Sequence, residues 1–190
     1  MALSRPDVLA AAVTILDTWG LADLTMRRLA DALGVRAGAL YWHYPNKQTL
    51  LAAIADAILA EAPAPASGPW ADAVGDWALG LRGALLAHRD SADLVASTRA
   101  MGLVSVDVAA PAAVRFGDAG LPEAEARAAG QALVRYVLGH VAEEQAQADF
   151  DRLGPGRSAP ALDRVDADSF AFGVRLLLDG VGAIRPRVGP

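Results

Sequence analysis

The sequence of 190 residues contains no cysteine. The chain therefore cannot form a disulfide bond, use a thiol nucleophile or hold a cysteine-ligated zinc ion. It also lacks any uncharged apolar run approaching about 18 residues, and its N-terminus lacks the apolar centre of a signal peptide. We expect a cytoplasmic protein that does not cross a membrane.

Signs of catalysis are also scarce. The chain has only three histidines, no nucleophile beside a base, and no glycine-rich phosphate loop after a strand. His140, Glu143 and Glu144 have the i, i+3, i+4 spacing of one helical face, which suits a divalent metal or the acid and base of a helical hydrolase. We favour the alternative that His140 is a satisfied histidine at a helix interface, and we expect no catalytic residue, no cofactor and no metal.

Charge is distributed unevenly along the chain. The composition, 54% hydrophobic and 21% charged, is that of a globular protein, and the net charge of −5 at first argues against a nucleic-acid partner. However, residues 1–48 carry a net charge of +1 and the remaining residues −6. Because DNA affinity depends on local cations that face phosphates, this distribution is compatible with DNA binding.

Residues 24–47 predict a helix-turn-helix. A first helix is expected from an N-cap at Thr25 to Leu33, with apolar residues at helical spacing. Gly34 then allows a tight reversal, and a second helix spans roughly 36–44 before Pro45 ends it. The alternative, an ordinary helical hairpin in a core, leaves the aromatic cluster 41–44 beside a basic residue without a reason.

The second helix of such a motif normally lies in the major groove of DNA. Arg36 is the best candidate for a bidentate contact to guanine O6 and N7, with a phosphate contact as the next most plausible role. The small side chains at 37–39 allow the backbone to approach the DNA closely, whereas Trp19 and Trp42 are assigned to the core. The predicted DNA-binding residues are Thr25, Arg27, Arg36, Ala37, Gly38, Ala39, Tyr41, His43, Tyr44 and Lys47, in which Arg27, Tyr41, Tyr44 and Lys47 contact phosphates.

Helical periodicity continues through the rest of the chain. Helices are expected over 4–19, 47–61, 70–89, 92–99, 122–150 and 167–184, and Pro111 should start, kink or split another within 103–117. Three prolines make 62–69 non-helical, and composition makes 151–166 a loop. The predicted domains are a helix-turn-helix domain over 1–48, connected by the helix 47–61, and an effector-binding and dimerisation domain over 62–190.

The last helix is apolar on more than one face, so a second apolar surface must be covered. A partner chain is the simplest cover, with the helices ending near 150 and 184 forming a four-helix bundle with their symmetry mates. The alternative is a fully central helix of a monomer. The predicted interface residues are Val134, Val137, Leu138, Val141, Phe170, Val174, Leu177 and Val181.

The segment Leu24–Lys47, with its Leu-Tyr-Trp-His-Tyr run and its Asn-Lys pair, resembles the DNA-binding segment of the TetR family. The remainder is similar to the tetracycline-repressor branch at Ala84–Asp90, Thr98–Arg99, Gly139–Gln145 and Phe172–Gly173. The resemblance implies an all-α homodimeric repressor of about nine to ten helices. It would have an N-terminal three-helix DNA-binding domain and a larger helical domain for ligand binding and dimerisation, with a four-helix-bundle interface. A small molecule would release it from a palindromic operator, as in an antibiotic response.

Two departures from that branch concern the effector. Its members hold magnesium-tetracycline partly through a histidine three residues before the threonine matching Thr98, and Val95 occupies that position here. A further polar contact falls on Pro63. Because valine cannot ligate a metal, we expect a hydrophobic or aromatic effector and not magnesium-tetracycline. The predicted effector-binding residues are Trp70, Trp77, Leu81, Leu85, Thr98, Arg99, Met101, Leu103 and Glu143. A dimeric adaptor without DNA binding remains a further alternative.

Overall fold

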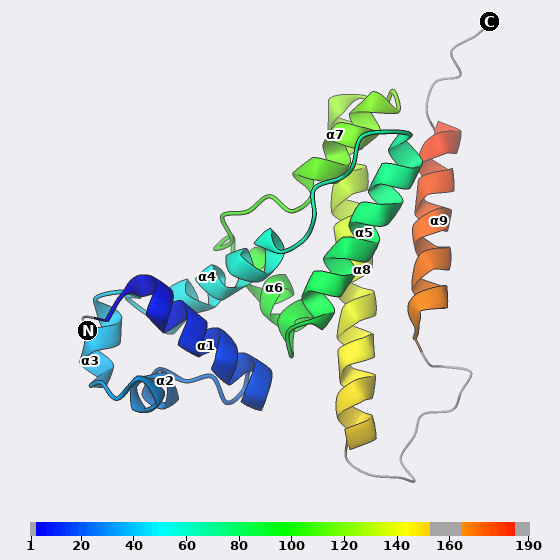
Figure 1. Cartoon of the computed structure of the whole chain (residues 1–190). Helices are drawn as coiled ribbons and strands as arrows, with labels where there is room; N and C mark the ends of the chain where they lie inside the picture. Colours follow the sequence, from blue (N-terminus) through cyan, green and yellow to red (C-terminus); the bar gives the residue numbers. More distant parts are fainter. Residues whose placement is uncertain (1–2, 153–164, 185–190) are drawn as a thin grey trace, which may run out of the picture. The chain divides into compact units, whose positions relative to one another are not determined.

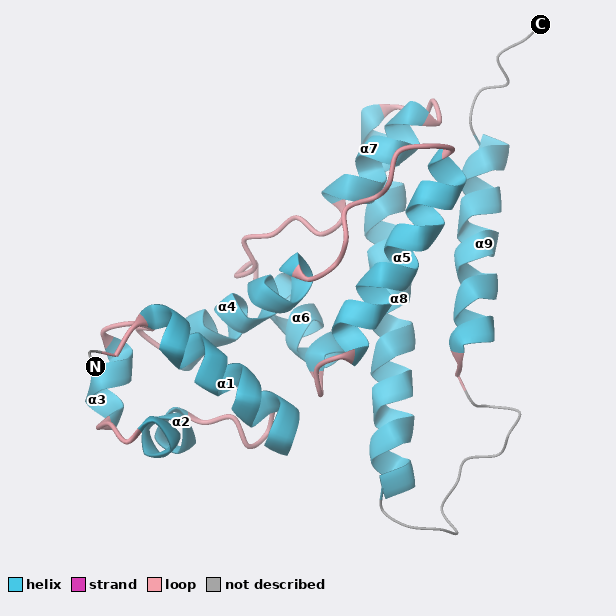
Figure 2. Cartoon of the chain, in the orientation of Figure 1, coloured by secondary structure: helices cyan, strands magenta, loops and turns pink. Residues whose placement is uncertain are grey.

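A computed structural model describes residues 3–152 and 165–184 of the chain. Within those ranges every regular element is an α-helix, and no strand occurs (Figure 1, Figure 2). The prediction of an all-α fold is confirmed. The helices are α1 (Arg5–Trp19), α2 (Met26–Leu33), α3 (Ala37–Tyr41), α4 (Lys47–Ala60), α5 (Trp70–Leu86), α6 (Ser91–Ala100), α7 (Ala110–Asp118), α8 (Glu123–Arg152) and α9 (Ala167–Ile184).

None of these described helices is both long enough and apolar enough to cross a membrane. Most of the loop predicted over 151–166 lies outside the described residues. Pro111 falls in the first turn of α7, so it starts that helix and does not kink it.

Helix starts are fixed by local hydrogen bonds. Ser4 and Asp7 form a capping box at α1, and hydrogen bonds from Ser4 hold the pKa of the Asp7 carboxyl below its usual value. Asn46 and Thr49 form a second box at α4, in which Asn46 Oδ1 accepts from the Thr49 amide at 2.9 Å. These short signals explain why α1 and α4 begin within one residue of their predicted starts.

The chain forms two compact units. Unit 1 contains residues 1–61 and 84–106, and unit 2 contains residues 62–83 and 107–190. The predicted boundary at 62–69 coincides with one point where the chain passes from one unit to the other. The prediction did not anticipate that 84–106 would join the N-terminal helices.

Polar contacts explain why this returning segment belongs to unit 1. Asp90 Oδ2 accepts from the Leu21 amide at 2.7 Å. His88 lies between two carboxylates, with Nδ1 at 3.1 Å from Asp17 and Nε2 at 3.2 Å from Glu61. The segment therefore fastens the ends of α1 and α4 together. The same unit has an apolar core of Val8, Ala12, Leu16, Leu29, Leu40, Leu50, Ile54, Ile58, Leu94 and Val95.

Unit 2 is built around the long helix α8. A Cβ atom at Gly130 would lie 2.9 Å from the Ala109 carbonyl oxygen, so the missing side chain lets α7 and α8 approach closely. On another side, Phe170 of α9 is fully buried and stacks on Tyr136 of α8. Figure 1 shows α9 running beside α8 in this unit.

A buried polar cluster joins three helices of unit 2. Arg82 of α5 donates to both carboxylate oxygens of Glu144, at 2.7 and 2.5 Å. His140 Nε2 lies 3.1 Å from Glu144 Oε1 and 3.0 Å from the Asp166 carbonyl oxygen. The Tyr136 hydroxyl donates to the Phe170 carbonyl, and burial, with a smaller effect of the Glu144 carboxylate, raises the pKa of Tyr136. The cluster thus fixes α5 and the start of α9 to α8.

Candidate nucleic-acid interface and effector site

The N-terminal helices have the geometry of a helix-turn-helix. Thr25 caps α2, since its Oγ1 accepts from the Arg28 amide at 3.1 Å. Gly34 adopts the left-handed conformation with φ 66°, and the Val35 amide donates to the Ala30 carbonyl at 3.0 Å, which closes the reversal. The predicted cap and pivot are therefore present. Helix α3 ends at Tyr41, three residues earlier than predicted.

Nine of the ten predicted DNA-binding residues retain surface exposure. Thr25, Arg27, Arg36, Ala37, Gly38 and Tyr41 are exposed, and Ala39, His43 and Lys47 are half-buried. Arg36 stands immediately before α3, and its side chain makes no capping hydrogen bond. Lys47 opens α4 next to its Asn46 cap. The turn therefore presents basic, hydroxyl and small side chains from α2, α3 and the start of α4.

The tenth residue, Tyr44, is a correction. Its side chain is only 1% exposed, with the Arg5 guanidinium 4.7 Å from the ring centroid, so it cannot reach a phosphate. The Tyr44 amide donates to the Leu40 carbonyl at 2.9 Å. Because the chain turns after α3, the ring points into the core.

The tryptophans of this unit are a second correction. Trp42, assigned to the core, is 91% exposed, and Trp19 is 56% exposed. The helical register of α3 contained the missing signal for Trp42, because a residue two positions after buried Leu40 lies on the opposite side of a helix. Trp19 instead covers the Arg28 guanidinium at 5.1 Å, and Arg28 also pairs with Asp23 at 2.9 Å.

The predicted effector-binding residues are distributed over both units. Trp70, Trp77, Leu81 and Glu143 belong to unit 2, whereas Leu85, Thr98, Arg99, Met101 and Leu103 belong to unit 1. Trp77, Leu81, Leu85 and Thr98 are buried, whereas Met101 and Leu103 are 52% and 37% exposed. The Thr98 hydroxyl donates to the Leu94 carbonyl of its own helix at 2.7 Å. Trp70 packs edge-on against Phe116 at 6.0 Å.

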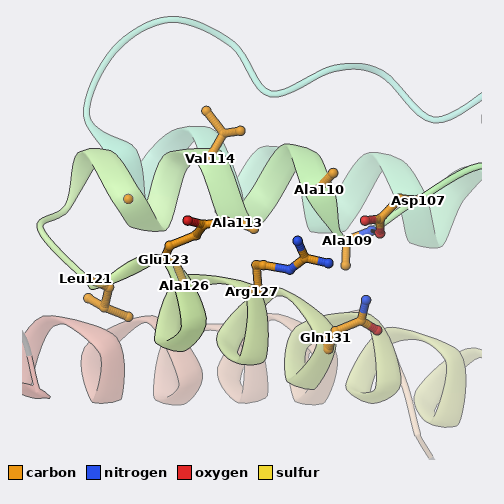
Figure 3. A pocket seen from close by; sticks show the side chains of 11 residues that line it. Asp107, Ala109, Ala110, Ala113, Val114, Leu121, Glu123, Ala126, Arg127 and Gln131 are labelled. Carbon is orange, nitrogen blue, oxygen red and sulfur yellow. Dashed lines mark hydrogen bonds between the residues drawn. The ribbon is translucent and has the colours of Figure 1, made fainter.

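A groove of about 410 Å³ lies between α7 and α8 in unit 2. Figure 3 shows the small side chains of α7 facing α8, with Arg127 extending between the two helices. None of the predicted effector residues lines it, because the prediction favoured large apolar residues and this lining is mostly alanine. The lining residues are Asp107, Ala109, Ala110, Ala113, Val114, Gly117, Leu121, Glu123, Ala126, Arg127 and Gln131.

The predicted dimer interface contains side chains that are already covered within one chain. Val134, Val137, Val141 and Phe170 have no exposed surface, Val174, Leu138 and Val181 are at most 8% exposed, and Leu177 is half-buried. Their burial contradicts an assignment to an open surface, because they form the internal face of α8 and α9. The other face of α9 exposes Phe172 by 55% and Leu176 by 56%.

The metal and hydrolase alternatives for His140 have no geometric support. Glu143 is exposed, whereas Glu144 is held by Arg82 and also contacts His140. Across the described ranges, no group of three or more histidine, aspartate or glutamate side chains is placed to hold a metal ion. His140 is therefore part of the helix packing of unit 2.

Comparison with known proteins adds independent information. The profile of the bacterial regulatory proteins of the tetR family matches residues 8–54. The profile of the tetracyclin repressor-like C-terminal domain matches residues 62–165. The chain belongs to the TetR family. The prediction of a ligand-responsive, DNA-binding transcriptional repressor is confirmed by this membership and by the helix-turn-helix.

Relatives and solved structures of TetR-family members agree over nearly the whole chain. The class E tetracycline repressor of Escherichia coli is 37% identical, with 95% of this chain and 92% of the relative covered. The crystal structure of Mycobacterium smegmatis BioQ has a TM-score of 0.86 at 42% identity, covering 96% of this chain and 99% of that one. A second BioQ structure, solved with its natural double-stranded DNA operator, has a TM-score of 0.81 at 39% identity, covering 96% of this chain and 99% of that one.

Proposed function

We propose that this TetR-family chain represses transcription as a homodimer on a palindromic operator. The two α3 helices would enter successive major grooves about 34 Å apart. The observation that carries the proposal is the exposed Arg36 at the start of α3, directly after the Gly34 pivot. BioQ, at 39% identity, was solved with its operator, which supports the same mode of action here.

The proposed DNA contacts fall into two classes. Arg36 donates to the edge of a guanine, and Arg27, Tyr41 and Lys47 contact phosphates from three neighbouring segments. Arg28 is excluded from the set, because Asp23 and Trp19 already hold its guanidinium. We add the exposed indole of Trp42 as a further contact to the sugar-phosphate backbone.

The proposed dimer surface is the outer side of α8 and α9. On α8 it consists of exposed small residues, and on α9 of Phe172 and Leu176, separated by one helical turn. Cβ atoms at Gly139 and Gly180 would meet nothing within the chain, so both positions offer room for a helix of the second copy. Such a flat two-helix surface suits a four-helix bundle. The small residues are Ala128, Ala132, Gly139 and Ala146.

The proposed effector is an apolar or aromatic molecule that favours the DNA-free form. The groove between α7 and α8 supports this, since its walls are alanine, valine and leucine with polar groups at the rim. Tetracycline repressors are among the relatives, and a TetR variant of Acinetobacter baumannii 33% identical to this chain was solved with minocycline. We nevertheless propose that magnesium-tetracycline is not the main effector, because Val95 is fully buried and offers no ligand atom.

We further propose a cytoplasmic protein without catalytic activity. Its operator would lie on cytoplasmic DNA, and His140 has its Nε2 occupied by Glu144 and the Asp166 carbonyl. The relatives reported above are named as repressors.

Operator binding by arginine and lysine variants tests the function. The operator is sought by footprinting the DNA upstream of the protein's own gene, where a palindrome is expected. Arg36→Ala should weaken binding at least tenfold, since a bidentate guanine contact contributes about 1–3 kcal/mol. Lys47→Ala should weaken binding equally on all sequences and reduce the salt dependence by about one ion per site.

Arg152→Ala is the matched control, because Arg152 is an exposed arginine at the end of α8. It should bind the operator like the wild type. Unchanged operator affinity in both Arg36→Ala and Lys47→Ala would refute the proposed DNA interface.

A further inference from the structure

The outer face of α3 has almost no hydrogen-bonding capacity. Between Arg36 and Tyr41 it carries Ala37, Gly38 and Ala39, of which the first two are exposed and the third is half-buried. None of these side chains can donate or accept a hydrogen bond. A helix that reads DNA only by polar contacts would therefore have a single reader, Arg36.

Gly38 stands at the centre of this face, and nothing within the chain requires a glycine there. It is not among the described glycines with positive φ. A Cβ atom added to it would meet no heavy atom within 4 Å. Gly130 provides the contrast, because α7 fills the space where its side chain would stand.

Glycine inside a helix is less stable than alanine, because its backbone loses more freedom on folding. A glycine with space around it and an ordinary φ therefore weakens α3 without an internal gain. Its advantage must come from something that approaches α3 from outside. Under the proposed function, that molecule is the major groove of the operator.

The chemistry of the groove indicates which bases fit such a face. The C5 methyl of thymine is the apolar group that base pairs present in the major groove, and alanine makes favourable contacts with it. We propose that Gly38 is the point of closest approach to the bases, and that Ala37 and Gly38 determine specificity by accommodating thymine methyl groups. Each half-site then combines one guanine, facing Arg36, with adjacent thymine. This inference rests on the proposed function.

The first experiment uses DNA selected from a random pool by the full-length wild-type protein. Each thymine in the selected duplex is replaced in turn by uracil, which removes only the methyl. At one or two positions per half-site the dissociation constant should rise about fourfold, the effect of losing one buried methyl. Failure to select any sequence would count against the proposed function itself. Selection followed by no effect of uracil at any position would overturn the methyl readout alone.

The second experiment compares Gly38→Ala with Gly83→Ala. Gly83 is an exposed helical glycine of α5 whose added Cβ also meets nothing, so it is a matched control. Both variants should raise the melting temperature by about 2–4 °C. Only Gly38→Ala should weaken operator binding, by tenfold or more, and uracil at the facing position should recover part of the loss.

The outcomes separate clearly. A Gly38→Ala protein that binds the operator as tightly as the wild type shows that no close approach occurs there. A lower melting temperature shows that the glycine serves the fold. Either result overturns the inference.

Discussion

At the scale of single residues, the ion pair between Arg82 and Glu144 is the main polar contact inside unit 2. The two side chains are 17% and 12% exposed, and they make two hydrogen bonds. Arg82 also lies over the Phe170 ring at 5.3 Å. Removing one partner of a sheltered pair leaves the other charge without compensation, which costs more than the pair contributes.

We therefore expect Glu144→Gln to lower the free energy of unfolding by about 2–4 kcal/mol, measured by urea denaturation. Glu143→Gln is the matched control, because the neighbouring carboxylate is exposed, and it should change stability by less than about 0.5 kcal/mol. Equal effects of the two substitutions would show that the Arg82 contact contributes little.

Residue-scale prediction from the sequence succeeded where the signal was local. Thr25 and Gly34 take their predicted roles because a cap and a left-handed reversal depend on a few neighbouring bonds. Tyr44 and Trp42 exchanged their predicted environments, since the side that each faces depends on where α3 ends. A helix of five residues is terminated by its packing more than by its sequence.

At the scale of elements, α4 is tied to the segment that leads into α7. The Asp56 carboxylate accepts from the Ser105 amide at 2.9 Å and from the Val106 amide at 3.1 Å. Asp107, the next residue along the chain, lines the groove between α7 and α8. Movement of the groove wall would therefore act on α4 through a short piece of chain.

Asp56→Ala should release this segment while the helices remain folded. We expect faster hydrogen-deuterium exchange in residues 103–106 and a loss of about 1 kcal/mol in stability, the usual value of such hydrogen bonds. Asp72→Ala, an exposed aspartate of α5, should leave the exchange of this segment unchanged. Unaltered exchange in Asp56→Ala would show that other contacts hold the segment.

Element boundaries were predictable from periodicity, proline and caps, but the inward faces were not. Both α8 and α9 carry apolar residues on more than one side, and the sequence does not say which side its own chain covers. The predicted interface therefore selected the internal face, including Val137 and Phe170. The groove lining escaped prediction for a related reason, because alanines such as Ala113 become a cavity wall only when a second helix stands opposite.

At the scale of the whole molecule, the exposed apolar side of α9 determines how copies would associate. Phe172 and Leu176 are more than half exposed, and Ile184 is 68% exposed. Apolar side chains at helical spacing on one surface indicate an interaction site. Operator binding by a palindrome depends on that association, because it sets the distance between the two α3 helices.

Leu176→Glu should convert the homodimer to a monomer and weaken operator binding at least tenfold, since a buried charge disfavours the interface. Sedimentation should then report one chain of 19.6 kDa in place of two. Leu79→Glu, which alters a leucine 45% exposed on α5, should leave the mass and operator binding of the dimer unchanged. A Leu176→Glu protein that remains dimeric would place the interface elsewhere.

Lys47, the first residue of α4, is the only lysine in the sequence. An acyl-transfer reagent thus has one side-chain amine to modify, and it stands at the start of the helix that follows the recognition turn. Acylation there would erase a single positive charge. A fluorophore attached at the same atom would report duplex occupancy without any engineered attachment point.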